Sequence, residues 1–162
     1  MTISVGDRLP EATLFEMTDQ GPAQVASADV FRAKTVALFG LPGAFTPTCS
    51  KSHMPGFVAA ADALRAKGVD AIVCVTVNDP YVAAEWGRVT GATAAGIRVL
   101  GDSLAELTRA MGLDFDGSAR GLGVRCKRFS ALVKDGEVTV LNIEEAPGQA
   151  VCSVGEVLLD QI

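Results

Sequence analysis

The sequence predicts an α/β fold with a mixed central β-sheet flanked by helices. Two strongly apolar runs of strand length, 35–40 and 69–77, are each followed by a segment with helical periodicity. Further along the chain, an Asp-Gly pair at 135–136 separates two β-rich segments, which predicts a hairpin. The 162 residues contain no repeat and no linker-like change in composition, so we expect one domain over residues 1–162.

The first half of the chain is expected to supply two strands and one long helix. Residues 12–16 predict a short edge strand, followed by a turn at 19–22 that contains Gly and Pro. The run at 35–40 carries β-branched and aromatic residues, as buried strands do. After it we expect a helix from residue 48 to residue 67, kinked at Pro55 because proline has no N–H to donate.

The next elements continue the alternation of strand and helix. Residues 69–77 are almost wholly apolar, which is typical of a central strand covered on both faces. Residues 79–89 predict a helix, since the Pro80 that follows Asp79 suits a first helical turn. A short strand is expected at 98–100.

The last third begins with a helix at 104–111, capped by Asp102 or Ser103. Four glycines within 112–123 predict a long surface loop. The remaining expected elements are the two hairpin strands and a last helix: 129–134, 137–143 and 153–161.

Composition excludes several classes of protein. The formal net charge is −5 and the only basic cluster is 125–128, so we expect neither nucleic acid nor a membrane surface as a partner. No apolar run approaches the roughly 20 residues that cross a bilayer, and the N-terminal residues lack a signal core, so we expect a cytoplasmic protein. The cysteines lie far apart and there is one His, so we expect no metal and no cofactor. The four cysteines are Cys49, Cys74, Cys126 and Cys152.

The most informative segment is 42–49, Pro-Gly-Ala-Phe-Thr-Pro-Thr-Cys, which joins the 35–40 strand to the following helix. It places Cys49 in the first turn of that helix, where free N–H groups and the helix dipole favour a thiolate, the reactive form. The hydroxyl of Thr46, one turn earlier, is positioned to bond the sulfur or a substrate oxygen, and it also suits a helix cap. The context therefore predicts a nucleophilic cysteine.

The spacing Pro-x-x-x-Thr-x-x-Cys resembles the active-site signature of the peroxiredoxins. The stretch 41–57 resembles their type II (five-type) subgroup in particular, and the likeness continues at 77–82, at Trp86 and at 127–130. The resemblance implies a thioredoxin-like fold with peroxiredoxin N-terminal additions and a thiol-dependent peroxidase. It implies that Cys49 is the peroxidatic cysteine, oxidised to a sulfenic acid by hydrogen peroxide or small alkyl hydroperoxides.

The resemblance also implies the other site residues. Thr46 would orient the peroxide, and Pro42 would shape the loop and exclude water. A guanidinium suits the task of holding both sulfur and peroxide oxygen; of the three arginines Arg120, Arg125 and Arg128, the family pattern matches Arg128. His53 shares a helical face with Cys49, but a protease-like Cys–His pair normally comes from distant segments. We therefore give His53 a structural or rim role, and Trp86 a packing role.

The sequence leaves two routes open for the reduction of the Cys49 sulfenic acid. Cys152 lies in the loop before the last helix and matches the resolving cysteine of the animal type II enzymes, which implies a Cys49–Cys152 disulfide reduced by thioredoxin. Cys74 lies mid-strand, as in plant and some bacterial members that commonly use glutaredoxin and glutathione; a buried apolar role is the alternative. Cys126 departs from the family pattern and is expected to be a bystander.

Two other functional classes share parts of this pattern. A peroxide-sensing redox switch or a holdase with little multiple turnover would use the same reactive thiol. A thiol–disulfide oxidoreductase is disfavoured because the chain has no Cys-x-x-Cys pair. The resemblance further implies a homodimer that meets near the active-site loop, with apolar surface from Phe45 and 81–86.

Overall fold

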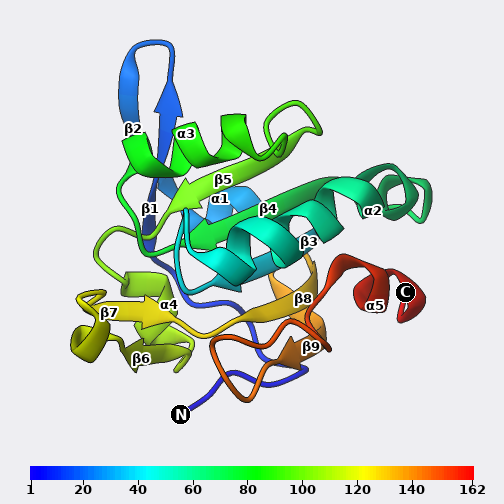
Figure 1. The fold of residues 1–162 in the computed structure, drawn as a ribbon. Helices are drawn as coiled ribbons and strands as arrows, with labels where there is room; N and C mark the ends of the chain where they lie inside the picture. The colour runs from blue at the N-terminus through cyan, green and yellow to red at the C-terminus, as the bar shows by residue number, and fades with distance from the viewer.

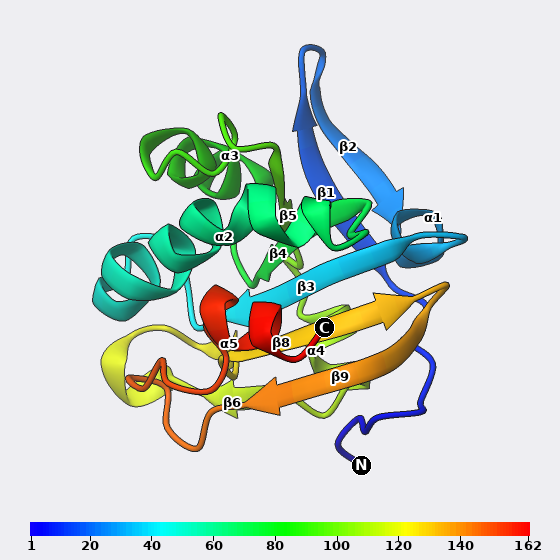
Figure 2. The ribbon, with the colours of Figure 1, turned by 90° about the vertical axis from the view of Figure 1, so that its right-hand side faces the viewer.

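The computed structural model describes all 162 residues, Met1 to Ile162. A seven-stranded mixed sheet runs through the molecule in the order β2-β1-β5-β4-β3-β8-β9, with helices on both of its faces (Figures 1 and 2). The α/β class and the thioredoxin-like arrangement that the sequence predicted are confirmed. None of the helices is long and apolar enough to span a membrane.

The element bounds are as follows. The large sheet contains β1 (Thr13–Thr18), β2 (Gly21–Ala26), β3 (Thr35–Leu41), β4 (Ala71–Thr76), β5 (Ile97–Gly101), β8 (Phe129–Lys134) and β9 (Glu137–Ile143). A small second sheet contains β6 (Asp114–Asp116) and β7 (Val124–Cys126). The helices are α1 (Ser27–Phe31), α2 (Met54–Ala66), α3 (Pro80–Val89), α4 (Glu106–Ala110) and α5 (Gly155–Asp160), with a π-helical segment at Cys49–His53 and a 3₁₀ turn at Ser118–Arg120.

Strand β3 lies at the centre and leads directly to the cysteine loop. It pairs in parallel with β4 and antiparallel with β8. Alternate residues pack into two separate cores, because successive side chains of a strand point to opposite faces. Phe39 packs with residues of α2, α3 and α5, whereas Leu38 packs with residues of α1 and α4. The strand is therefore covered on both faces and gives the loop that follows it a rigid base.

A strand is present where 12–16 predicted one, but it is not an edge strand. β1 lies inside the sheet between β2 and β5, and β2 forms the edge (Figure 2). The predicted turn is present, but β2 follows it at once and pairs Pro22 with Met17. Proline is tolerated at a sheet edge because its missing N–H then leaves no ladder bond unmade.

The predicted helix over 48–67 is present as one continuous helical run over 47–66, but its first part is π-helical. A π-helical segment, Cys49–His53, comes first, and its bond runs from the N–H of Met54 to the carbonyl of Cys49. Helix α2 then begins at Met54 with Pro55 in its first turn. Because Pro55 has no N–H, the carbonyl of residue 51 cannot receive the ordinary helical bond, and the chain re-registers there.

The elements predicted for the last third of the chain are confirmed only in part. The predicted hairpin is confirmed, with positive φ at both turn residues, Asp135 (47°) and Gly136 (81°). Ala105 is the N-cap residue of α4, but Asp102 supplies the capping bonds, since its carboxylate accepts from the N–H groups of Leu107 (3.3 Å) and Thr108 (2.8 Å). The predicted surface loop at 112–123 is partly wrong, because β6 and the 3₁₀ turn lie within it and β6 pairs with β7. Helix α1 was not predicted.

The end of β3 offers a test of this packing. Gly40 lies opposite Phe129 of β8, and a β-carbon there would collide with the Phe129 ring. Gly40→Ala is therefore expected to lower the free energy of unfolding by about 1–3 kcal/mol, as overpacked cores do. Gly56→Ala in α2 is the matched control, since a β-carbon there meets nothing within 4 Å; it should raise stability by about 0.5–1 kcal/mol. Urea denaturation of both variants checks this, and equal effects would contradict the assigned packing.

Candidate active site

Cys49 is positioned by the end of β3 and by the helical turn that follows. Its side chain is fully buried, and it is the first residue of the π-helical segment. The first bond of the helical turn runs from the N–H of Ser50 to the carbonyl of Thr46 at 3.0 Å. The cysteine therefore lies in a first helical turn, as the sequence predicted.

The loop before Cys49 is held by side chains from other segments. The amide oxygen of Asn78 accepts bonds from the N–H of Ala44 (2.9 Å) and from the hydroxyl of Thr76 (2.6 Å). The Thr46 hydroxyl donates to the carbonyl of Gly43 at 2.7 Å. Its proton is thus engaged within the loop, and its oxygen lone pairs remain able to accept a bond from a peroxide O–H.

Arg128 is the arginine that reaches the sulfur. Its Nη2 donates to Cys49 Sγ at 3.2 Å and to the carbonyl of Pro147 at 2.9 Å. The residue is only 1% exposed, so its cation has little access to water. Its Nε has no hydrogen-bond partner, and it forms no salt bridge. Since a buried cation is costly without a counter-charge, this contact stabilises negative charge on the sulfur.

His53 lies against Arg128 in the interior, which fits the structural one of its two expected roles and not the rim role. It is fully buried, with Phe39 and Phe57 packed edge-on against its ring. Arg128 Nη1 lies 3.1 Å from Nδ1, and the carbonyl of Ser153 lies 3.0 Å from Nε2. A guanidinium only donates and a carbonyl only accepts, so Nδ1 is the acceptor and Nε2 carries the proton. Burial, reinforced by the Arg128 charge, lowers the pKa of His53 to about 3.

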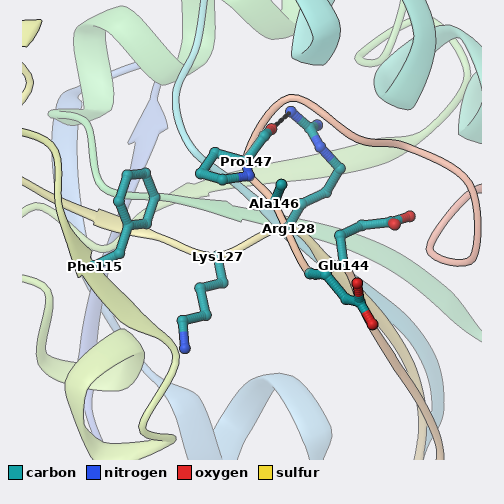
Figure 3. Close-up of a pocket in the computed structure, with 7 residues that line it drawn as sticks. Phe115, Lys127, Arg128, Glu144, Ala146 and Pro147 are labelled. Carbon is teal, nitrogen blue, oxygen red and sulfur yellow. Dashed lines mark hydrogen bonds between the residues drawn. The ribbon is translucent and has the colours of Figure 1, made fainter.

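The segment that carries Cys152 is folded onto this site by Glu144. One oxygen of Glu144 accepts bonds from three successive backbone N–H groups and from one hydroxyl. Burial alone would raise the pKa of Glu144, but these bonds lower it overall. Figure 3 shows the 144–147 segment beside Arg128, with the Pro147 carbonyl bonded to the guanidinium and Lys127 pointing away from it. The donors are Val151 N, Cys152 N, Ser153 N and Ser153 Oγ.

Two cavities meet at Arg128. The smaller, of about 180 Å³, is the one drawn in Figure 3. The larger, which we call the main groove, has a volume of about 770 Å³ and extends from the cysteine loop to the 3₁₀ turn. The cysteine loop contributes Pro42 and Thr46 to its lining, and the 115–122 segment contributes Phe115, Arg120 and Leu122. Pro42 and Thr46 thus meet Arg128 in one cavity, and Arg120 lies in its wall, exposed.

The other three cysteines differ sharply in exposure. All four are free thiols. Cys74 is fully buried in β4, and burial raises its pKa well above the usual value. Cys126 is also fully buried, and burial raises its pKa to about 12. Cys152 is half-buried, and its pKa is raised by burial and by the neighbouring Glu144. Of the three, only Cys152 lies in a segment bonded to Arg128 and His53.

Several residues of the site had no role predicted from the sequence. Asn78 lies in the 77–82 stretch that carried the family resemblance, which is the one signal that could have identified it. Glu144 had no such signal, because its partners belong to irregular backbone. Trp86 packs as predicted, and it also donates its indole N–H to the Ser50 hydroxyl at 3.0 Å, beside Cys49.

Comparisons with known proteins agree with this fold and site. The family model described as Redoxin matches residues 4–158. A chloroplastic peroxiredoxin-2E-2 of Oryza sativa subsp. japonica is 47% identical over 97% of this chain and 72% of its own length. Peroxiredoxin-2B of Arabidopsis thaliana is 43% identical over 96% of each chain. The reduced Prx3 of Vibrio vulnificus in complex with hydrogen peroxide has a TM-score of 0.92 and 41% identity, over 99% of both chains.

A buried cysteine at a helical turn, bonded to a buried arginine on this fold, defines a thiol-based redox protein. The chain belongs to the redoxin family and, within it, to the peroxiredoxins.

The lowered pKa of His53 leads to a prediction about pH. Unfolded histidine titrates near its ordinary pKa of 6.5, whereas folded His53 titrates at about 3. The unfolded chain therefore binds more protons between these values, and stability falls as pH falls through this window. His53→Asn keeps an acceptor oxygen toward Arg128 but cannot titrate. Denaturation between about pH 5 and 6.5 should show a slope shallower in the variant by up to about 1.4 kcal/mol per pH unit. Identical slopes would contradict the buried neutral imidazole.

Proposed function

We propose that this peroxiredoxin is a thiol-dependent peroxidase in which Cys49 is the peroxidatic residue and Arg128 its electrostatic partner. The observation that carries the proposal is the 3.2 Å contact between Arg128 Nη2 and Cys49 Sγ within a buried site. The hydrogen peroxide complex of the related Prx3 supports the smallest hydroperoxide as a substrate. The main groove beside the site supports small alkyl hydroperoxides as further substrates.

The chemistry follows from the positions of these groups. The Cys49 thiolate attacks the terminal oxygen of R–O–O–H, so that an S–O bond forms as the O–O bond breaks. The sulfur is oxidised to a sulfenic acid, and the departing oxygen leaves as R–O⁻ and is protonated to R–OH or water. Arg128 stabilises charge first on the sulfur and then on the departing oxygen. Thr46 accepts a bond from the peroxide O–H, and Pro42 forms part of the wall around it.

For recycling we propose Cys152 as the resolving residue. Its thiolate would attack the sulfenic sulfur, forming a Cys49–Cys152 disulfide and releasing water, and thioredoxin would then reduce the disulfide. The bonds from the 144–153 segment to Arg128 and His53 support this choice, because they attach the segment that carries Cys152 to two residues of the site. The alternative is attack by glutathione and reduction by glutaredoxin; full burial in β4 argues against Cys74 as the resolving residue.

We propose a homodimer that uses the surface around the cysteine loop. Phe45 is 56% exposed and Tyr81 is 65% exposed, so both large rings face outward. Phe45 also has a positive φ of 63°, a strained conformation for a bulky residue that turns its ring away from the core. Trp86 cannot contribute to this surface, contrary to expectation, because it is fully buried. The cytoplasmic location stays a prediction.

The roles of Cys49 and Arg128 are tested by single-turnover kinetics with hydrogen peroxide. Cys49→Ser is expected to abolish peroxide consumption. Arg128→Met should lower the second-order rate constant by about 10²–10³, since it removes one charged donor from the reacting atoms. Cys126→Ala is the matched control and should keep the parent rate. A Cys49→Ser variant that still consumes peroxide would exclude this mechanism, and a single round without turnover would instead favour the redox-switch or holdase reading.

The resolving step is tested by comparing Cys152→Ser with Cys74→Ala. With thioredoxin as reductant, Cys152→Ser should lose turnover while keeping one round of peroxide reduction, and Cys74→Ala should keep both. Because the pKa of Cys152 is raised, disulfide formation in the parent should accelerate as pH rises above neutrality. Stopped-flow turnover and mass spectrometry of the linkage measure this. Full thioredoxin-linked turnover by Cys152→Ser would exclude it, and turnover with glutathione and glutaredoxin alone would favour the one-cysteine cycle.

A further inference from the structure

Arg125 makes a contact that the peroxidase chemistry does not use. Its Nε donates to the carbonyl of Leu122 at 2.9 Å, and its Nη1 donates to the carbonyl of Pro42 at 3.1 Å. Arg125 lies in β7, and its guanidinium therefore joins this strand and the turn before it to the loop that leads to Cys49, 83 residues away in sequence. No other side chain donates a hydrogen bond to either of these two carbonyls.

The two joined residues line the main groove. Pro42 belongs to the cysteine-loop part of the lining, and Leu122 belongs to the part formed by 115–122. Arg125 does not line the groove itself, but its two hydrogen bonds connect the two parts of the wall. A shift of one part relative to the other would change the width of the groove.

The outer part of the wall projects from a base that is fixed in the core by Leu113 and Cys126, both fully buried. Its turn is closed by backbone bonds from Gly117 N to Gly123 O (2.7 Å) and from Leu122 N to Gly117 O (3.1 Å). The sheet that supports it has only two strands of three residues, β6 and β7. A two-stranded ribbon has little stability of its own. The Arg125 bridge is the side-chain hydrogen bond that joins this part of the chain to the cysteine loop, so the position of the turn relative to that loop depends on it.

Gly43 provides the space for the bridge. A β-carbon at Gly43 would collide with Arg125 Nη1. The φ of Gly43 is not positive, so the backbone itself accommodates alanine. The absent side chain thus allows the guanidinium to reach the Pro42 carbonyl.

We propose that Arg125 is a positioning residue that sets the width of the main groove and thereby the activity toward bulky organic hydroperoxides. The inference rests on the proposed peroxidase function. Hydrogen peroxide fills about the volume of two waters, roughly 60 Å³, so it needs only the end of the groove at Cys49, Thr46 and Arg128. An organic hydroperoxide extends along the groove between the two parts of the wall that Arg125 joins. Loss of the bridge therefore affects the larger substrate more.

The test compares kcat/KM for cumene hydroperoxide and for hydrogen peroxide in four proteins: the parent, Arg125→Ala, Gly43→Ala and the double variant. Arg125→Ala is expected to lower kcat/KM for cumene hydroperoxide by about 10-fold, mostly through KM, and that for hydrogen peroxide by less than about threefold. Gly43→Ala should do the same by displacing the guanidinium. The double variant should be no worse than Arg125→Ala, because both changes break one contact. Arg32→Ala, an exposed arginine paired with Asp29, is the control and should change neither value.

Each outcome decides the question. Equal losses for both hydroperoxides, no loss, or additive effects in the double variant would overturn the role of Arg125. A parent protein that reduces neither hydroperoxide would overturn the proposed function itself, which separates the two failures. Should Arg125→Ala not fold, as judged by thermal unfolding, Arg125→Lys replaces it. A lysine keeps the charge but lacks the planar fork that bonds both carbonyls, so the same selectivity loss is expected.

Discussion

A guanidinium buried without a carboxylate partner is the constraint on which this site depends. Arg128 is almost fully enclosed, and its contacts are a neutral imidazole, a backbone carbonyl and the sulfur of Cys49. A carboxylate in place of His53 would neutralise the cation and weaken its hold on the sulfur. The imidazole accepts a hydrogen bond while adding no charge, so the positive charge remains available to the reacting atoms. Burial of His53 keeps that arrangement unchanged over the pH range in which proteins function.

The surrounding structure fixes this arrangement through contacts between distant segments. Asn78 at the end of β4 holds the cysteine loop through Ala44, and Arg125 of β7 holds it through Pro42. Glu144 fixes the segment after β9, whose carbonyls bond Arg128 and His53. Because each contact joins a loop to the end of a strand, the loops are irregular yet well determined. The sheet thus serves as the common reference for the sulfur, the cation and the groove.

The parts predictable from sequence are those with a local cause. Apolar runs, the Asp135-Gly136 turn and the strand–loop–helix context of Cys49 act within a few residues, and these predictions held. The edge strand β2 and the short helix α1 are formed by pairing and packing, not by local preference, so the sequence pattern did not indicate them. His53 was placed correctly on the face of Cys49, but its burial arises from distant segments, among them Phe39 of β3, Arg128 and the segment around Ser153. The supporting roles of Asn78, Arg125 and Glu144 exist only in the folded chain.

The π-helical segment at Cys49–His53 has a consequence for how the site moves. The segment is continuous with α2, and a wide bond from the N–H of Met54 to the carbonyl of Cys49 spans their junction, while Pro55 has no N–H to donate. The turn that carries Cys49 therefore has fewer ordinary helical bonds than the regular turns of α2 that follow it. Under the proposed two-cysteine cycle, this π-helical turn is the part of the helix that we expect to unwind when Cys49 joins Cys152.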